Sequence, residues 1–267
     1  MAGDSVLSTA TLLGFLLTLV RVAGVFVFVP VPGLKSAVDP ARVLLIVGIT
    51  IALFPVWPHH FGEYPVTGES AAGKASVGEL TVWIASESAL GLGIGLAVSF
   101  AIEAFLVGAQ VISLQAGYSF ASTVDPSTQA DSGVLIVFAQ LAAALLFFAM
   151  GLDREVLRIF ARSLETVPAG TFLLTRGAGQ SLIAAGSTIF STGLRLALPV
   201  IAVMIMTDIS LALLGRVNSQ LHLLALAFPV KMIVGLCLLG WLATLLPALL
   251  RGGSGISFAA ARALVAR

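Results

Sequence analysis

The chain has 267 residues, of which 58% are hydrophobic and only 10% are charged, and its formal net charge is +1. A soluble domain of this size carries about 25% charged residues, so much of this exterior must face lipid or other apolar protein. The small net charge argues against nucleic-acid binding, and the lone Cys237 has no partner for a disulfide or a zinc site. The composition therefore predicts an integral membrane protein or a subunit of a membrane-embedded assembly.

Six apolar blocks predict hydrophobic helices along the chain. They run roughly over residues 6–31, 43–57, 80–114, 134–150, 182–214 and 221–250. A helix needs about 20 residues to cross a bilayer core, so the second block is short for a span. Pro199 and Pro229 lie inside the last two blocks, where proline removes a helical hydrogen bond and kinks the axis. We expect about six partly kinked helices, several of which need not cross the lipid.

A segment between the fourth and fifth blocks, residues 153–167, predicts an amphipathic helix. Its apolar side chains share one face, and three arginines lie on the other: Arg154, Arg158 and Arg162. Asp153 is the predicted N-cap, and Pro168 with Gly170 ends the helix. Two locations fit this pattern equally, namely a membrane interface or packing against the rest of its own subunit.

Basic residues gather in two places, at 152–180 and in the C-terminal tail, whereas the 115–132 loop has none. If six spans exist, the positive-inside rule puts both termini and the 152–180 segment in the cytoplasm. The 115–132 loop would then lie on the far side or within the membrane.

Six ionisable side chains lie inside the apolar blocks: Arg21, Glu87, Glu103, Arg195, Asp208 and Lys231. Each is expensive in hydrocarbon, by ~2.5–3.5 kcal/mol for a central Arg, Lys or Asp. Three are basic and three acidic, which favours mutual neutralisation in ion pairs that fix subunit packing. The alternative is a proton relay or ion path.

A polar, turn-forming segment at residues 115–132 separates two strongly apolar blocks. In lipid, irregular backbone is tolerated only where protein or a water-filled cavity surrounds it, so this stretch is the candidate gate segment. Its candidate residues are Gln115, Gly117, Phe120, Ala121, Ser122, Thr123, Val124, Asp125 and Pro126. A simple polar connector is the alternative.

The sequence offers no pattern of an enzyme or of a cofactor site. There is no Walker motif, Ser-His-Asp arrangement or dinucleotide fingerprint, and His59-His60 has no third metal ligand nearby. We therefore expect no catalysis, no cofactor and no metal. The spacing of Gly91 and Gly95 instead predicts a close approach between two helices.

Four motifs resemble, in their order and spacing, the FliR family of flagellar protein export gate subunits. They are Arg21-Val22-Ala23-Gly24 through Pro30 to Pro40-Ala41-Arg42-Val43, Phe120 to Pro126, Arg158 to Gly170, and Asp208 to Phe228-Pro229-Val230-Lys231. The resemblance covers about residues 10–250. The central loop favours the flagellar branch over the related injectisome SctT subunits.

The resemblance implies an all-α subunit that packs in a closed helical ring with FliP-like and FliQ-like subunits, around an export channel in the bacterial inner membrane. FlhB-like and FlhA-like proteins, exported flagellar proteins and membrane lipid are the further partners it implies. Residues 1–182 would form a FliP-like part, 183–250 a FliQ-like hairpin kinked at Phe228 and Pro229, and 251–267 a tail. The gate segment would plug the pore.

The competing function is a small secondary transporter or proton-coupled channel that uses the intramembrane charges. Transporters of that kind often have two halves of matching hydropathy. The short second block has no counterpart in the second half of this chain, so the sequence favours the export gate. A scaffold subunit outside the pore is a third possibility.

Overall fold

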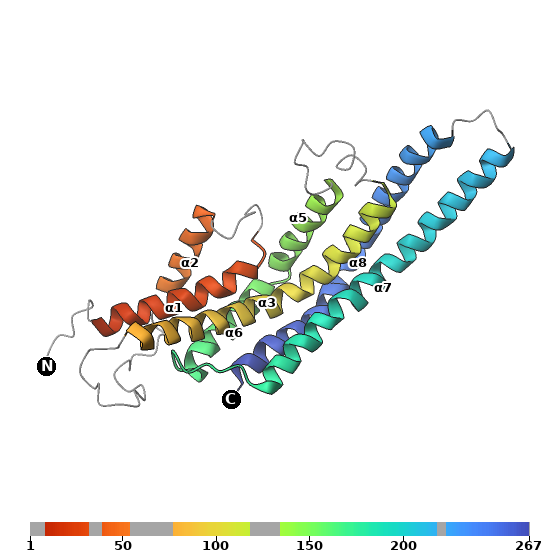
Figure 1. The fold of residues 1–267 in the computed structure, drawn as a ribbon. Coiled ribbons are helices and arrows are strands. Elements are labelled where there is room, and N and C mark those ends of the chain that lie inside the picture. The colour runs from red at the N-terminus through yellow and green to blue at the C-terminus, as the bar shows by residue number, and fades with distance from the viewer. Residues whose placement is uncertain (1–8, 32–38, 54–76, 118–133, 218–222, 267) are drawn as a thin grey trace. The chain divides into compact units, whose positions relative to one another are not determined.

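The computed structural model describes residues 9–31, 39–53, 77–117, 134–217 and 223–266. These residues form helices and no strands, which confirms an all-α membrane protein (Figure 1). The helices are α1 (Thr9–Phe28), α2 (Pro40–Ala52), α3 (Val77–Gln115), α5 (Val134–Ala149), α6 (Leu152–Thr166), α7 (Arg176–Val217) and α8 (Leu223–Val265).

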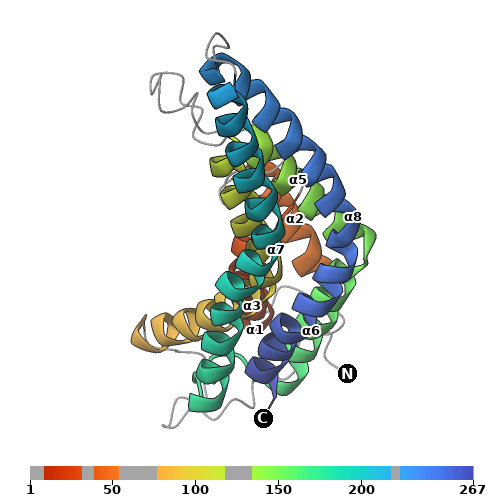
Figure 2. The same ribbon diagram turned by 90° about the vertical axis from the view of Figure 1, so that its right-hand side faces the viewer.

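The chain divides into two compact units. The first unit comprises Met1–Ser99, Gly151–Ala185 and Ile256–Arg267, and the second comprises Phe100–Met150 and Gly186–Gly255. Helices α1, α2 and α6 belong to the first unit and α5 to the second, while α3, α7 and α8 each contribute to both. In the second unit α7 and α8 run antiparallel, side by side (Figure 2).

Helices α1 and α3 touch through their backbones in the first unit. A Cβ atom added to Gly91 would collide with the carbonyl oxygen of Arg21, and one added to Gly95 would collide with that of Val25. On the α1 side, a Cβ on Gly24 would lie 2.8 Å from the backbone nitrogen of Leu92. The close helix approach predicted from Gly91 and Gly95 is therefore confirmed.

Helix α2 starts with proline in its first turn, after the N-cap Asp39, whose side chain accepts a hydrogen bond from the Ala41 backbone N–H at 3.1 Å. It is 13 residues long, as the short second block led us to expect. Its buried side chains recur every fourth residue: Arg42, Ile46 and Thr50. That spacing puts them on one face of the helix.

Helix α6 lies within one residue of the predicted boundaries, but the predicted cap is wrong. The N-cap is Gly151, which has left-handed backbone angles and makes no side-chain capping bond. Asp153 lies instead in the first helical turn, where a carboxylate interacts favourably with the helix dipole. The buried side chains are Val156, Ile159, Phe160, Ser163 and Leu164. Because the apolar face is covered by the chain itself, the structure favours packing within the subunit over the membrane interface.

Two described helices, α3 and α7, are long and apolar enough to cross a membrane, and a third span results if α5 and α6 count as one broken helix. The six apolar blocks are therefore not six spans in the described part of the chain. Helix α8 also continues to Val265, beyond the predicted end of the sixth block at Leu250. Phe258, Ala261 and Leu264 are buried, so residues expected to form a tail end a packed helix instead.

Candidate functional site

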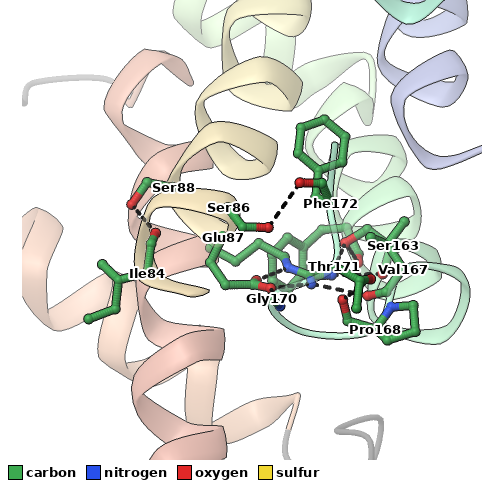
Figure 3. A network of polar contacts seen from close by, with 12 residues as sticks. Ile84, Ser86, Glu87, Ser88, Ser163, Val167, Pro168, Gly170, Thr171 and Phe172 are labelled. Atoms are coloured by element: carbon green, nitrogen blue, oxygen red, sulfur yellow. Dashed lines mark hydrogen bonds and ion pairs between the residues drawn. The ribbon is translucent and has the colours of Figure 1, made fainter. Parts of the chain in front are cut away.

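A buried ion pair joins α1 and α3 in the first unit, and its acidic member, Glu87, is labelled in Figure 3. The Arg21 and Glu87 side chains are each 1% exposed. Arg21 Nε donates to Glu87 Oε2 at 2.5 Å, and Nη2 donates to Oε1 at 2.9 Å. This is the two-pronged geometry that makes arginine–carboxylate pairs strong and specific.

The same guanidinium binds the end of α6. Arg21 Nη1 donates to the carbonyl oxygen of Ser163 at 2.7 Å and to its Oγ at 3.2 Å, and Nη2 donates to the Val167 carbonyl oxygen at 3.1 Å. The Ser163 carbonyl oxygen also accepts the Val167 backbone N–H at 3.1 Å, and a positive charge at this end of a helix is favoured by the helix dipole. All five N–H donors of the arginine are thus used.

The connection between α6 and α7 is fastened to α3 at the same place. The Gly170 backbone N–H donates to Glu87 Oε1 at 2.8 Å, and Ser86 Oγ donates to the Phe172 carbonyl oxygen at 3.1 Å (Figure 3). Gly170 has a φ of 76°, and a Cβ atom there would lie 2.5 Å from Trp83 Cδ1. One buried charge pair therefore positions α1, α3 and the turn that follows α6.

The chemistry of this cluster suits positioning. A guanidinium stays protonated in proteins, and here every one of its donors is already engaged. Both partners belong to the same chain, so the pair stabilises the packing of this chain's own helices. Breaking it would leave a buried charge without compensation, which is strongly destabilising.

A second ion pair lies in the second unit, between α7 and α8. Lys231 Nζ is 2.6 Å from Asp208 Oδ1, and both side chains are partly exposed. Glu103 on α3 and Arg195 on α7 are exposed and form no ion pair with any described residue. Of the six charges predicted from the sequence, four thus form ion pairs among the described residues, and Glu103 and Arg195 do not.

The gate segment is described only at its start, and residues Phe120, Ala121, Ser122, Thr123, Val124, Asp125 and Pro126 lie outside the described residues. Helix α3 ends at Gln115, and Gly117, with a φ of 82°, donates to the Leu114 carbonyl oxygen at 3.2 Å. Left-handed glycine at this position is a common way to end a helix. A Cβ atom on Gly117 would lie 3.3 Å from the ring of Phe228, so two residues singled out from the sequence lie together. The kink predicted at Phe228 and Pro229 stays a prediction, since α8 is helical through both.

A partly exposed carboxylate, that of Glu155, ties the end of α8 to α6 in the first unit. Arg262 Nη2 lies 2.5 Å from Glu155 Oε1, and Arg158 Nη1 lies 3.4 Å from Oε2. The hydrogen bond from Arg262, with the charges of both arginines, lowers the pKa of Glu155. Thr166 Oγ1 also donates to the Val265 carbonyl oxygen at 3.1 Å. These contacts help to hold the end of α8 in the first unit.

Sequence reasoning missed two members of the first-unit cluster and the pairing of two others. Ser163 falls on the otherwise apolar face of α6, which is the one signal that could have revealed it. Gly170 was expected only to end the helix, and the sequence around it gives no sign that it packs against Trp83. The pairing of Arg21 with Glu87 joins residues 66 positions apart, beyond the reach of any local pattern.

The comparisons with known proteins agree across nearly the whole chain. Residues 12–254 match the family described as bacterial export proteins, family 1. The flagellar biosynthetic protein FliR of Escherichia coli (strain K12) is 30% identical over 229 residues, which cover 85% of this chain and 83% of that protein. FliR of Pectobacterium carotovorum is 32% identical over 62% of this chain and 64% of its own length. FliR of Caulobacter vibrioides is 25% identical over 78% and 80%.

These matches confirm the resemblance seen in the motifs, and they cover residues of both compact units. Together with the membrane-capable helices α3 and α7, they identify a membrane-embedded component of the flagellar export apparatus. The chain belongs to the FliR family of flagellar biosynthetic proteins.

Proposed function

We propose that this chain forms, with FliP-like and FliQ-like subunits, the channel through which flagellar proteins cross the bacterial inner membrane. It acts in this channel as a conduit subunit and not as an enzyme. One observation carries the proposal. Two charged side chains in the second unit, Glu103 and Arg195, are exposed on helices that are long and apolar enough to span a membrane.

Glu103 and Arg195 each lie on a strongly apolar helix. Leu114 is exposed on the same helix as Glu103, and exposed Leu194 and Leu198 flank Arg195. An ionised side chain in hydrocarbon costs ~2.5–3.5 kcal/mol on insertion scales, and no described residue of this chain pairs with either group. Neighbouring subunits that supply the opposite charges would remove this penalty.

The outer surface of α7 supports the same proposal. Large apolar side chains are exposed along its length in the second unit: Phe190, Met206, Ile209, Leu213 and Val217. Extended apolar surfaces mark contacts with other proteins or with lipid. A helix that carries both these side chains and Arg195 is better covered by further helices than by lipid alone.

The remaining assignments follow from family membership. Residues 1–182 would be the FliP-like part and 183–250 the FliQ-like hairpin, with FlhB-like and FlhA-like proteins as further partners. The gate segment would close the channel until export begins. Gly117 supports this role, because its left-handed backbone ends α3 beside Phe228, directly before the rest of the segment.

Co-expression tests the proposal. The chain expressed alone should aggregate or be degraded, and co-expression with the FliP-like and FliQ-like subunits of the same bacterium should yield a discrete complex. Glu103→Gln should lower the recovery of that complex more than Glu165→Gln, a matched change at an exposed position on polar α6. A stable monomer in mild detergent that takes up solutes in liposomes would favour the transporter instead.

A further inference from the structure

Three arginines form a row along the exposed face of α6. Arg154, Arg158 and Arg162 are four residues apart, so each is turned by about 40° from the one before it and lies ~6 Å further along the helix. All three are exposed, and the Arg158 side chain is 76% exposed. The buried side chains of α6 lie on its other side, so this arginine row is accessible to a ligand.

The described chain neutralises the arginine row only in part. The Glu155 carboxylate lies 3.4 Å from Arg158 Nη1, but it also accepts a hydrogen bond from Arg262 Nη2 at 2.5 Å. No hydrogen bond or ion pair reaches the guanidinium of Arg154 or Arg162 from any described residue. Like charges four residues apart on a helix repel each other, so an anion between neighbouring members of the row would be stabilising.

The surface around the row carries an excess of positive charge. Arg262, at the end of α8, is 59% exposed and joins the row through Glu155. Four exposed arginines are therefore accompanied by two glutamates, Glu155 and the exposed Glu165. The third acidic residue of α6, Asp153, is turned more than 90° away from the row by its helical position, and its Oδ1 is buried.

The helix that precedes α6 has the opposite character. Helix α5 contains no charged residue, and it exposes four large apolar side chains: Phe138, Leu141, Leu145 and Phe148. Helix α6 begins at Leu152, three residues after α5 ends at Ala149. A change along the chain from an uncharged, apolar surface to a row of arginines is typical of the place where a membrane protein leaves the hydrocarbon layer and meets the headgroups.

We propose that the arginine row binds the phosphate groups of anionic phospholipids at the membrane surface. A phosphate between two neighbouring members of the row would accept hydrogen bonds from both guanidiniums, whose planar forks match its oxygens. The apolar face of α6 is covered by the chain itself, so the helix meets the headgroups with its polar face and does not insert into the lipid. The nearby apolar surface of α5 favours lipid over an acidic segment of another protein, since only lipid supplies both hydrocarbon and phosphate.

The first arm of the test measures lipid binding. The chain is purified in neutral detergent with the FliP-like and FliQ-like subunits and titrated with phosphatidylglycerol or phosphatidylcholine, and bound lipid is counted by native mass spectrometry. We expect the anionic lipid to bind more tightly, and Arg162→Gln to weaken its binding about fivefold. Arg216→Gln removes an exposed arginine from α7 in the second unit and should leave binding unchanged. Equal binding of the two lipids, or equal effects of the two variants, would overturn the proposal.

The second arm separates charge from folding. Replacing all three arginines of the row by glutamine should abolish the preference for phosphatidylglycerol. Replacing all three by lysine should retain most of it, because lysine also binds phosphate as a point charge. Thermal unfolding of both variants shows that they remain folded, as expected for changes at exposed positions. A folded triple glutamine variant that still prefers phosphatidylglycerol would overturn the proposal.

The third arm identifies the occupant in the cell membrane. A photo-crosslinking phenylalanine analogue replaces Ala161, which is half-buried and precedes Arg162 on the same side of the helix. Irradiated membranes should yield a phospholipid adduct, and the triple glutamine variant should yield much less of it. An adduct with another protein in place of lipid would overturn the proposal and identify an acidic protein partner instead.

This inference and the proposed function fail separately, because lipid binding requires only that the chain is embedded in a membrane. If the wild-type chain forms no complex with the FliP-like and FliQ-like subunits, the proposed function is wrong. The lipid measurements are then made on the chain alone, extracted from the membrane with its lipids by an amphipathic polymer. If the complex forms without a preference for anionic lipid, the channel proposal stands and the role given to the arginine row is wrong.

Discussion

Arg21 on α1 and Glu87 on α3 are 66 positions apart in sequence, and the distance from Arg21 Nε to Glu87 Oε2 is 2.5 Å. Neither side chain is more than 1% exposed. The pair also holds Ser163, Val167 and Gly170, so it fixes the end of one helix and the turn after it to two others. Weakening this pair should therefore lower the stability of the whole first unit.

Arg21→Ala should destabilise the protein by ~3–5 kcal/mol, because Glu87 loses its buried counter-charge and the Val167 carbonyl loses its hydrogen bond from Arg21. Arg21→Lys keeps the charge but not the fork, so its loss should be intermediate. Thermal unfolding of the co-purified complex measures both. The control is Arg158→Ala, since Arg158 is 76% exposed and an exposed pair contributes about 0–1 kcal/mol. Equal losses for Arg21→Ala and Arg158→Ala would contradict the role given to Arg21.

Two glycine-to-alanine substitutions, one at the contact between α1 and α3 and one away from it, should have opposite effects on stability. Gly91→Ala should destabilise the protein by about 1–3 kcal/mol, since the new Cβ atom meets the backbone of Arg21. Gly48→Ala, on α2, meets nothing within 4 Å and should stabilise its helix by up to ~1 kcal/mol. The two variants are compared by thermal unfolding under one condition. A stabilising Gly91→Ala would show that the helices can separate at little cost.

Alanine substitutions at Gly170 and Gly151 distinguish the cost of backbone strain from the cost of side-chain crowding. Both have positive φ, 76° and 69°, but only Gly170 packs against an aromatic ring, and the nearest atom to a Cβ on Gly151 is 4.0 Å away. Each alanine variant should lose ~1–2 kcal/mol from the left-handed backbone, and Gly170→Ala should lose more. Gly170→Ala should also shift the fluorescence of Trp83, measured with Trp57 and Trp241 replaced by phenylalanine. Identical stability and emission for the two variants would argue against the Trp83 contact.

Apolar periodicity was enough to predict the helical class and α6 to within one residue, because burial of an apolar face leaves a local pattern. The end of α8 was missed for a physical reason. Gly252, Gly253 and Gly255 are poor helix formers, and they follow the last long apolar run. Packing of Phe258 and Leu264 in the first unit outweighs that propensity. The N-cap was missed because the helix is capped by a left-handed Gly151, two residues before Asp153.

The candidate site shows a similar limit. The six charges could be found from the sequence, because each interrupts an apolar block. Their pairing depends on how α1 packs against α3 and how α7 packs against α8, which no local spacing encodes.

The Glu155–Arg262 contact predicts a pH-dependent contribution to stability. Because the pKa of Glu155 is lowered in the folded state, the stabilisation is complete above the ordinary glutamate pKa of about 4.3 and is lost as pH falls through the lower, folded value. Arg262→Gln should therefore be less stable than wild type at pH 7, by less than ~1 kcal/mol, and the difference should vanish in stronger acid. Unfolding at several pH values measures this difference. Arg162→Gln, at an exposed position on α6, the helix that carries Glu155, should show no such pH trend.

The last prediction concerns the gate segment, whose role rests on its position and on the end of α3. Deleting Ser119–Thr128 should leave the complex largely assembled, because α3 and α5 remain intact on either side. The membrane should then become permeable to ions and small solutes, since the deletion removes the proposed plug while Gly117 still ends α3 beside Phe228. Conductance of the reconstituted complex in planar bilayers measures this directly. Removal of Gly62–Ala71, a deletion of equal length in another loop, should leave conductance unchanged. An assembled Ser119–Thr128 deletion complex that conducts no more than wild type would mean that the segment is a connector and that the channel is closed elsewhere.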